Sequence, residues 1–222
     1  AYHESGHASV SWLLEHAHPL VKVTIVPRGQ SLGAAWYLPE ERQLTTKEQM
    51  MDEICAALGG RAAEEIVFGS VSTGALSDLE KITKQAYAMV TVYGLNEKIG
   101  NVSFYDSSGG QEYAFHKPYS EKTAQVIDEE VSHMIEGAYQ RTKNLLTLHR
   151  EKLDKLASVL REKEVIFKED LETIFGRRPF EKDQEMPLIP VSASGNGTIA
   201  ATDLSGNAAQ QPAPSADKQS TT

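Results

Sequence analysis

The segment His3-Glu4-Ser5-Gly6-His7 constrains this chain more than any other, because it repeats a histidine after four residues. At ~3.6 residues per turn, side chains at i and i+4 lie one above the other on the same helical face. Two imidazole nitrogens placed in this way can hold one metal ion, and zinc is the metal most consistent with the pattern. Glu4 lies about 100° further round the helix, where a general base for a zinc-activated water should sit.

A surface helix with solvated histidines could have the same five residues. The neighbouring sequence is therefore needed to distinguish such a helix from a metal site. Val10, Leu13 and Leu14 follow at helical spacing, which predicts a helix over 1–16 that packs into a core. Val10 and Leu13 also stand where the extended pattern His-Glu-x-x-His-x-x-Gly-x-x-His requires Gly and a third His, so that pattern is excluded. A third protein ligand must come from farther along the chain.

Composition bounds the class of protein. The 222 residues, 40% hydrophobic and 24% charged, suffice for one globular core, and the formal net charge of -9 argues against nucleic acid as a partner. Cys55 is the only cysteine, which excludes an intrachain disulfide and predicts that this residue is small, apolar and buried.

No stretch of about 18 apolar residues occurs, so we expect this chain to be soluble by itself. It opens inside the predicted helix without an initiator Met, and we expect it to be part of a longer protein.

Two short strands are predicted after the first helix, which should end at His18-Pro19. Residues 21–26 alternate and are β-branched, and a turn at Pro27-Arg28-Gly29 leads to a second strand over 33–38. The two strands should form a small sheet with an accessible edge. A further short strand is predicted at 102–104, followed by a mobile loop at 107–110.

Helical periodicity recurs through most of the remaining chain. It predicts helices over 45–69, 77–93, 120–149, 153–165 and 170–175. Two of them should begin with capping boxes, Thr45 with Glu48 and Ser77 with Glu80. The pair Gly59-Gly60 weakens helix propensity by ~1 kcal/mol per glycine, which indicates close packing against another backbone. From about residue 181 the chain loses aromatics and gains Ser, Thr, Ala, Gln and Gly, so 181–222 is predicted to be a disordered low-complexity tail.

Residue spacing leaves two possible sources of the third zinc ligand. Glu64 and Glu65 follow the glycine pair on a predicted helix, and Asp78 opens the next helix after the loop Ser72-Thr73-Gly74-Ala75. Glutamates on an amphipathic helix are often only solvated, and an aspartate in a first helical turn is favoured by the helix dipole at ~0.3 to 1 kcal/mol. Physical reasoning does not choose between them.

Six segments, read together, carry a resemblance that runs from residue 1 to about Phe180. They are His3-Glu4-Ser5-Gly6-His7, Val23-Thr24-Ile25-Val26-Pro27-Arg28-Gly29, Leu32-Gly33, Leu38-Pro39-Glu40, Gly59-Gly60-Arg61-Ala62-Ala63-Glu64-Glu65 and Ser72-Thr73-Gly74-Ala75-Leu76-Ser77-Asp78-Leu79. This set resembles the peptidase domain of the FtsH family, which are membrane-anchored, ATP-dependent zinc proteases of bacteria and organelles. One departure is Ser5, where the family usually has Ala; serine neither ligates nor blocks the metal.

The resemblance implies a fold, a metal site and an activity. Residues 1–180 should be a mainly α, helical zinc-metallopeptidase domain with a small β-sheet near the active site. Asp78 matches the aspartate that completes the zinc site of the family, with His3 and His7, and Glu64 and Glu65 are left as supporting or structural groups. One Zn2+ per chain would then activate water and polarise the scissile carbonyl, while Glu4 transfers the proton.

Substrate and partners follow from the same resemblance. Unfolded or membrane polypeptides should be fed by an AAA+ ATPase ring, in a homo-hexamer anchored to a membrane. This chain has no Gly-x-x-x-x-Gly-Lys-Ser/Thr loop for ATP, so ATP belongs to an ATPase module outside it. The expected location of the longer protein is the cytoplasmic face of the bacterial inner membrane, with the mitochondrial inner membrane as the alternative.

The expected substrate site is the edge formed by the second strand, where an extended peptide would add through main-chain hydrogen bonds. The small residues Gly33, Ala34 and Ala35 would permit its close approach, although an ordinary packed strand has the same composition. Two rival functions remain: a catalytically inactive helical oligomerisation module built on 120–175, and a zinc hydrolase of small molecules, which would need a deep closed pocket.

Overall fold

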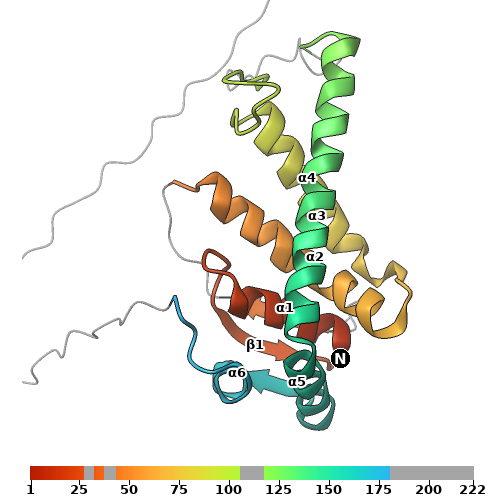
Figure 1. Cartoon of the computed structure of the whole chain (residues 1–222), viewed down its shortest axis with the longest axis vertical. Coiled ribbons are helices and arrows are strands. Elements are labelled where there is room, and N and C mark those ends of the chain that lie inside the picture. The colour runs from red at the N-terminus through yellow and green to blue at the C-terminus, as the bar shows by residue number, and fades with distance from the viewer. Residues whose placement is uncertain (28–32, 38–43, 106–117, 181–222) are drawn as a thin grey trace, which may run out of the picture. The chain divides into compact units, whose positions relative to one another are not determined.

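Helix α1 (Tyr2–Leu13) carries the two histidines and is packed on several sides by the other elements. The computed structural model describes residues 1–27, 33–37, 44–105 and 118–180, which belong to one compact unit (Figure 1). Within it α1 contacts α2, α4, α5 and the sheet, and every residue from Ser5 to Trp12 is buried. The prediction of a core-packed opening helix is confirmed.

The architecture is mainly helical, as predicted, with one small sheet. The other helices are α2 (Lys47–Phe68), the 3-10 turn η1 (Thr73–Ala75), α3 (Leu76–Thr91), α4 (Glu121–Leu148), α5 (Arg150–Lys163) and α6 (Lys168–Phe175). Figure 1 shows the long helix α4 crossing α2 and α3 and ending near α5. None of the described helices is long and apolar enough to cross a bilayer.

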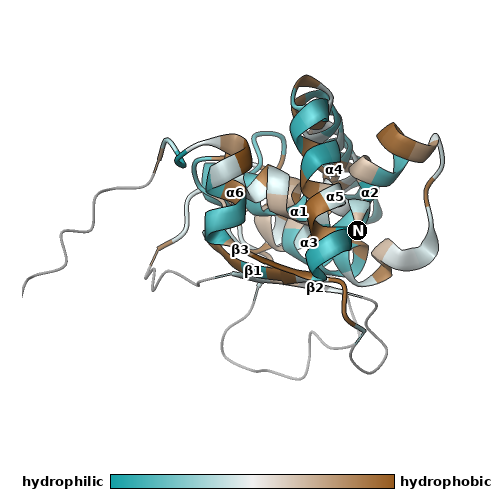
Figure 2. Ribbon diagram, turned by 90° about the horizontal axis from the view of Figure 1, so that it is seen from below, coloured by the Kyte–Doolittle hydropathy of each residue, from teal (hydrophilic) through white to brown (hydrophobic). Residues whose placement is uncertain are grey.

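The sheet has three antiparallel strands in the order β2-β1-β3. They are β1 (Leu20–Thr24), β2 (Ala34–Tyr37) and β3 (Val165–Phe167). Figure 2 shows them as a layer on one side of the helices. Since β1 is central, β2 is an edge strand, as predicted.

Strand β3 departs from the sequence prediction, which places Val165 in the preceding helix. Helix α5 instead ends at Lys163, and its C-cap Glu164, whose φ of 61° lies in the left-handed region, turns the chain. The Glu164 carbonyl then accepts from the Ile25 backbone N–H at 2.9 Å and from the Thr24 hydroxyl at 3.1 Å. The β-branched Val165 and Ile166 continue that pairing, so long-range strand pairing overrides the local helical periodicity.

Two apolar cores meet at α1. Val10 and Leu14 pack into the core between α1, α2, α3 and α4, and Ala8 and Trp12 pack into the core between α1, the sheet, α5 and α6. The expected burial of Cys55 is confirmed, with 0% of its surface exposed. Because opposite faces of α1 serve different cores, its position is fixed from both sides.

The end of α1 is tied to the distant segment after α6. The Trp12 indole N–H donates to the Gly176 carbonyl at 3.1 Å. The buried Arg178 guanidinium donates to the carbonyls of Leu14 at 2.9 Å, Glu15 at 3.2 Å and Ala17 at 2.6 Å. A buried cation thus donates hydrogen bonds to carbonyls of the irregular segment that follows α1.

Several predicted boundaries are wrong by a few residues. Helix α1 ends at Leu13, short of residue 16, because its C-cap Leu14 is already extended. The capping box of α2 uses Thr46 with Gln49, one residue after the predicted pair. Helix α3 begins at Leu76 after η1 and has no side-chain cap, so Ser77 lies inside the helix, and residues 102–104 form no strand. The turn at 28–29, the end of the second strand at Leu38, the loop at 107–110 and the tail at 181–222 lie outside the described residues.

The contact of α1 with α2 is a backbone contact at glycines, as the sequence predicted for the pair at 59–60. A Cβ on Gly6 would lie 2.1 Å from the Gly59 carbonyl oxygen, and a Cβ on Gly59 would lie 2.6 Å from the Gly6 carbonyl oxygen. No side chain fits at either position without separating the helices.

Gly6→Ala should therefore lower the free energy of unfolding by at least ~2 kcal/mol, because the added methyl group forces two backbones apart. Urea unfolding followed by circular dichroism measures the loss. Gly137→Ala is the matched control, since a Cβ there meets nothing within 4 Å on α4, and it should leave stability unchanged or raise it by ~0.5–1 kcal/mol. Equal effects of the two substitutions would contradict the packing argument.

Candidate metal centre

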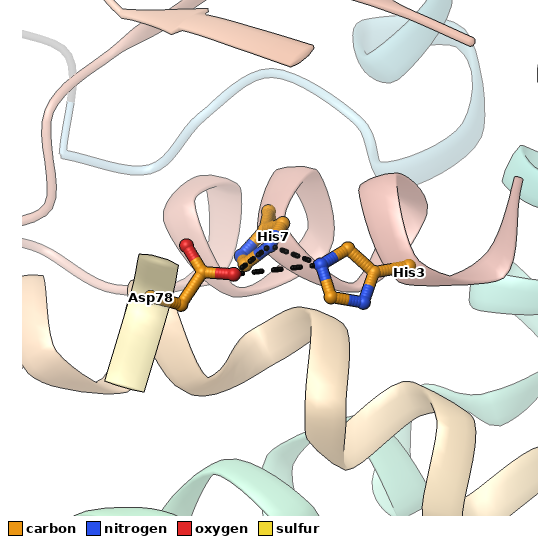
Figure 3. A group of neighbouring side chains, drawn as sticks. All are labelled: His3, His7 and Asp78. Atoms are coloured by element: carbon orange, nitrogen blue, oxygen red, sulfur yellow. Dashed lines mark hydrogen bonds and ion pairs between the residues drawn. The ribbon is translucent and has the colours of Figure 1, made fainter. Parts of the chain in front are cut away.

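His3, His7 and Asp78 come together although Asp78 belongs to a different helix. The Nε2 atoms of His3 and His7 lie 3.1 Å apart, and Asp78 Oδ2 lies 3.5 Å from each of them. Figure 3 shows both rings projecting from α1 toward the carboxylate that the first turn of α3 presents. Among the described residues this is the one group of three potential metal-ligating side chains that meets within 4.8 Å.

The hydrogen bonds of the two outer ring nitrogens determine what the inner nitrogens can do. His3 Nδ1 lies 2.9 Å from Glu64 Oε1, and His7 Nδ1 lies 2.9 Å from the Ala56 carbonyl oxygen. Both partners accept hydrogen bonds only, so each Nδ1 carries a proton. In neutral histidines both Nε2 atoms then present lone pairs to each other and to the Asp78 carboxylate. Three converging electron pairs repel one another unless a cation lies between them.

The spacing of these atoms fits zinc. Zn–N distances of about 2.0–2.1 Å and Zn–O distances of about 2.0–2.2 Å in a tetrahedron place neighbouring ligand atoms ~3.3 Å apart. The observed separations of 3.1, 3.5 and 3.5 Å bracket that value. Calcium would require six to eight oxygen ligands, which two imidazoles and one carboxylate do not supply. Three protein ligands also leave one tetrahedral position for water.

Glu64 lies behind His3 and fixes its ring. One carboxylate oxygen accepts from His3, and the other accepts from the Ser72 backbone N–H at 3.1 Å and the Ser72 hydroxyl at 3.0 Å. The opposite side of the ring has no spare room, because a Cβ on Gly60 would lie 2.6 Å from His3 Nε2. A carboxylate that holds the far nitrogen of a metal-ligating histidine is a common supporting arrangement.

Glu65 faces away from this group, toward α4. It accepts hydrogen bonds from the Lys143 ammonium at 2.7 Å and from the Tyr139 hydroxyl. Of the two glutamates that the sequence left open, Glu64 therefore contacts His3, whereas Glu65 contacts Lys143 and Tyr139.

Ionisation equilibria in the group favour an anion facing the two imidazoles. Burial by itself raises the pKa of Asp78, but its interactions with His3 and His7 hold that pKa well below its ordinary value. Burial lowers the pKa of His3, whereas its hydrogen bonds to Asp78 and Glu64 raise it, and the net shift is upward. In the absence of a metal, His3 therefore binds a proton more readily than an ordinary histidine does.

Glu4 lies beside the three residues in a half-buried position. Burial raises its pKa, the nearby histidines lower it, and Asp78 raises it, with a net upward shift. The chain just before β2 packs directly on it, since a Cβ on Gly33 would lie 2.7 Å from Glu4 Oε1. A half-buried carboxylate with a raised pKa is suited both to accept a proton and to return it.

A cavity of about 1130 Å³ joins the side chains of His3, His7 and Asp78 to the sheet edge. Gly33, Ala35 and Tyr37 line it together, because alternate residues of a strand share a face. Ala34 is paired through its backbone with Thr24 on β1, and its side chain lies outside the described part of the chain. Burial, followed by the charges of Glu4 and Asp78, raises the pKa of Tyr37 to about 12.

Sequence reasoning missed Tyr37, His18 and Glu53, which also line this cavity. Tyr37 could have been predicted, because it is the next alternate residue after Gly33 and Ala35 and so shares their face of the strand. No local signal points to His18 or Glu53, because they meet only when the segment after α1 packs against α2.

The fold and the site together define a helical metallopeptidase-type domain, with two histidines one helical turn apart and a carboxylate from a second helix. Comparison with known proteins agrees: the sequence profile of Peptidase family M41 matches residues 1–174, and the chain belongs to that family. The resemblance to the FtsH peptidase domain is confirmed.

Similar proteins come from bacteria and from mitochondria. The chain is 58% identical over 196 residues, 88% of its length, to ATP-dependent zinc metalloprotease FtsH of Parabacteroides distasonis. It is 55% identical over 181 residues, 81% of its length, to ATP-dependent zinc metalloprotease FTSH 3, mitochondrial, of Arabidopsis thaliana. It is 52% identical over 180 residues, again 81% of its length, to the mitochondrial inner membrane m-AAA protease component AFG3L2 of Mus musculus. The matches cover 28%, 22% and 22% of these relatives, so the chain spans about a quarter of their length.

The ligand arrangement predicts how three carboxylate variants should differ in zinc content. Asp78→Ala should lose the bound zinc, because two imidazoles alone hold it weakly. Glu64→Gln should weaken zinc affinity about 10- to 100-fold, because the amide holds the His3 ring less strongly. Glu65→Gln is the matched control and should bind zinc normally. Titration against a chelating dye measures all three, and zinc loss in Glu65→Gln with retention in Asp78→Ala would show that the ligand assignment is wrong.

Zinc affinity should fall as the pH decreases from about 7 to 5, because protons compete for His3 and His7. The raised pKa of His3 makes this competition begin above the ordinary histidine range, and each displaced proton costs up to about tenfold in affinity per pH unit. The same dye titration across pH, with circular dichroism to verify folding, tests this expectation. An affinity that stays constant down to pH 5 is incompatible with it.

Proposed function

We propose that this chain is a zinc-dependent endopeptidase domain, with His3, His7 and Asp78 as metal ligands and Glu4 as catalytic residue. The observation that carries the proposal is the convergence of three electron-pair donors at 3.1 to 3.5 Å beside the half-buried Glu4. Residues 1–180 form the peptidase domain in this proposal, and residues 181–222 are a low-complexity tail. An inactive oligomerisation module would have no use for a complete and supported ligand set.

Each of the chain's own residues has a defined part in hydrolysis. Bound zinc supplies a Lewis acid that polarises the scissile carbonyl and makes a water molecule acidic at neutral pH. Glu4 accepts the proton of the attacking water and delivers it to the departing amine, for which its raised pKa suits it. Glu64 and the Ala56 carbonyl keep the two imidazoles in the tautomer that leaves each Nε2 available.

The substrate is proposed to lie along β2 as an added strand. This edge strand pairs with β1 on one side, and its main-chain groups can pair with an extended peptide on the other. Gly33 lies against Glu4 at the start of the strand, and Ala35 lines the same cavity as the metal ligands. A peptide on this edge would be held through its main chain and would pass beside the reacting groups.

The longer protein is proposed to be an ATP-dependent protease. Relatives of this chain are named ATP-dependent zinc metalloproteases, and one is a component of an inner-membrane m-AAA protease. We therefore infer one Zn2+ per chain, an AAA+ module and ATP outside these residues, and a homo-hexamer that receives unfolded or membrane polypeptides and no nucleic acid. Its place would be the cytoplasmic face of a bacterial inner membrane, with the mitochondrial inner membrane as the alternative.

Glu4→Gln should retain zinc and lower kcat/KM for a short unstructured peptide by about 10²- to 10⁴-fold, because an amide cannot accept the water proton. A short peptide is suitable because its cleavage requires no unfolding. The matched control is Glu15→Gln just after α1, where the side chain is exposed, and it should leave turnover unchanged. Normal turnover by zinc-loaded Glu4→Gln would show that Glu4 does not accept the water proton in the reaction.

A further inference from the structure

The cavity at the metal centre continues beyond the zinc ligands. His3 packs against Gly60 and hydrogen-bonds Glu64, whereas His7 bonds the carbonyl of Ala56, which lies earlier in α2. Helices α1 and α2 therefore run in opposite directions where they touch. Along this contact, the positions next to His7 and Ala56 lie one turn after His7 on α1 and one turn before Ala56 on α2.

Those positions are Ser11 and Glu53, and both line the cavity. Ser11 follows His7 by four residues, so this part of the cavity lies ~6 Å beyond the ligands at ~1.5 Å per residue. The α2 wall between them consists of Ala56 and Ala57, whose small side chains leave the space open. The depth matches one long amino-acid side chain extended from a peptide beside the metal.

The far end of the cavity is rich in hydrogen-bond acceptors. His18 Nε2 lies 3.1 Å from Glu53 Oε1, and the Gln85 amide donates to Glu53 Oε2 at 3.0 Å. These contacts orient the Glu53 carboxylate, whose oxygens can each accept a further hydrogen bond. His18 Nδ1 is buried and has no hydrogen-bond partner among the residues described, and in the neutral ring it is an acceptor as well.

Carboxylates outnumber cationic side chains around this cavity. Glu4, Glu64 and Asp78 belong to the metal centre, and Glu53 is a fourth carboxylate that the proposed mechanism does not use. Lys81, exposed on α3, is the one lysine or arginine that lines the cavity within the described part of the chain. An acceptor-rich end with an unused carboxylate is complementary to a cationic donor group.

We propose that Ser11, Ala56, Ala57, His18 and Glu53 form a specificity pocket for one side chain flanking the scissile bond, and that this pocket favours lysine or arginine. The inference rests on the proposed peptidase function and adds a substrate preference to it. The main chain of the substrate would still bind along β2, while the Glu53 carboxylate would receive the cationic end of the side chain.

Peptides that differ only at the two residues flanking the cleaved bond, with Lys or Glu at either position, test the pocket. At one of the positions, the zinc-loaded chain should cleave the Lys peptide at least about tenfold better than the Glu peptide in kcat/KM. Glu53→Gln should reduce that ratio to about 1–3, because the amide keeps the size of the side chain and removes its charge. Glu162→Gln, an exposed change on α5, is the matched control and should preserve the ratio.

Binding provides a readout that does not depend on turnover. The zinc-loaded Glu4→Gln variant should bind the Lys peptide at least about tenfold more tightly than the Glu peptide in fluorescence anisotropy, and adding Glu53→Gln should abolish the preference. A ratio near 1 in both assays, or a preference that survives Glu53→Gln, would overturn the pocket. Preferential binding without cleavage by the parent chain would instead contradict the peptidase function and leave the pocket standing.

Discussion

The backbone contact of α1 with α2 at Gly6 and Gly59 is the constraint on which the site depends. Because neither residue has a side chain, the helices approach so closely that a Cβ on either glycine would overlap the opposite carbonyl group. This approach brings His3 against Gly60 and places the His7 ring within hydrogen-bonding distance of the Ala56 carbonyl. A wider helix spacing would keep the sequence motif and lose the contacts that orient both rings.

The candidate metal centre depends on that packing. Asp78 comes from the first turn of α3, so the three proposed ligands join two helices that are far apart in sequence. Without a cation, two imidazole lone pairs and a carboxylate face one another at 3.1 to 3.5 Å, and that arrangement is electrostatically unfavourable. Zinc binding should therefore stabilise the folded chain as well as enable catalysis.

The sequence predicted the site residues whose positions follow from local helical spacing. It predicted much less well those that are brought together by packing between helices. The pair His3 and His7 and the position of Glu4 followed from helical geometry alone. Asp78 was selected only through resemblance to a family, because spacing left Glu64 and Glu65 equally open. The structure separates the two glutamates by their partners, since one bonds His3 and the other bonds Lys143.

The fold shows the same division between local and long-range signals. Helix α4 lies where helical periodicity placed it, and its N-cap Ser120 is the first residue of the predicted range. Strand β3 was missed because its three residues gain strand structure only by pairing with β1, more than 100 residues earlier. The pair His18 and Glu53 escaped notice for a similar reason, because a polar contact between separate elements leaves no periodic trace in the sequence.

X-ray absorption spectroscopy of the zinc-loaded chain tests the central claim most directly, because it reports the atoms bound to the metal. The account predicts four nitrogen or oxygen neighbours at about 2.0–2.2 Å, with the outer-shell scattering of two imidazole rings and none from sulfur. Asp78→Ala should lose that spectrum through loss of the metal. A six-coordinate oxygen environment, or a spectrum with no imidazole scattering, would contradict the proposed site.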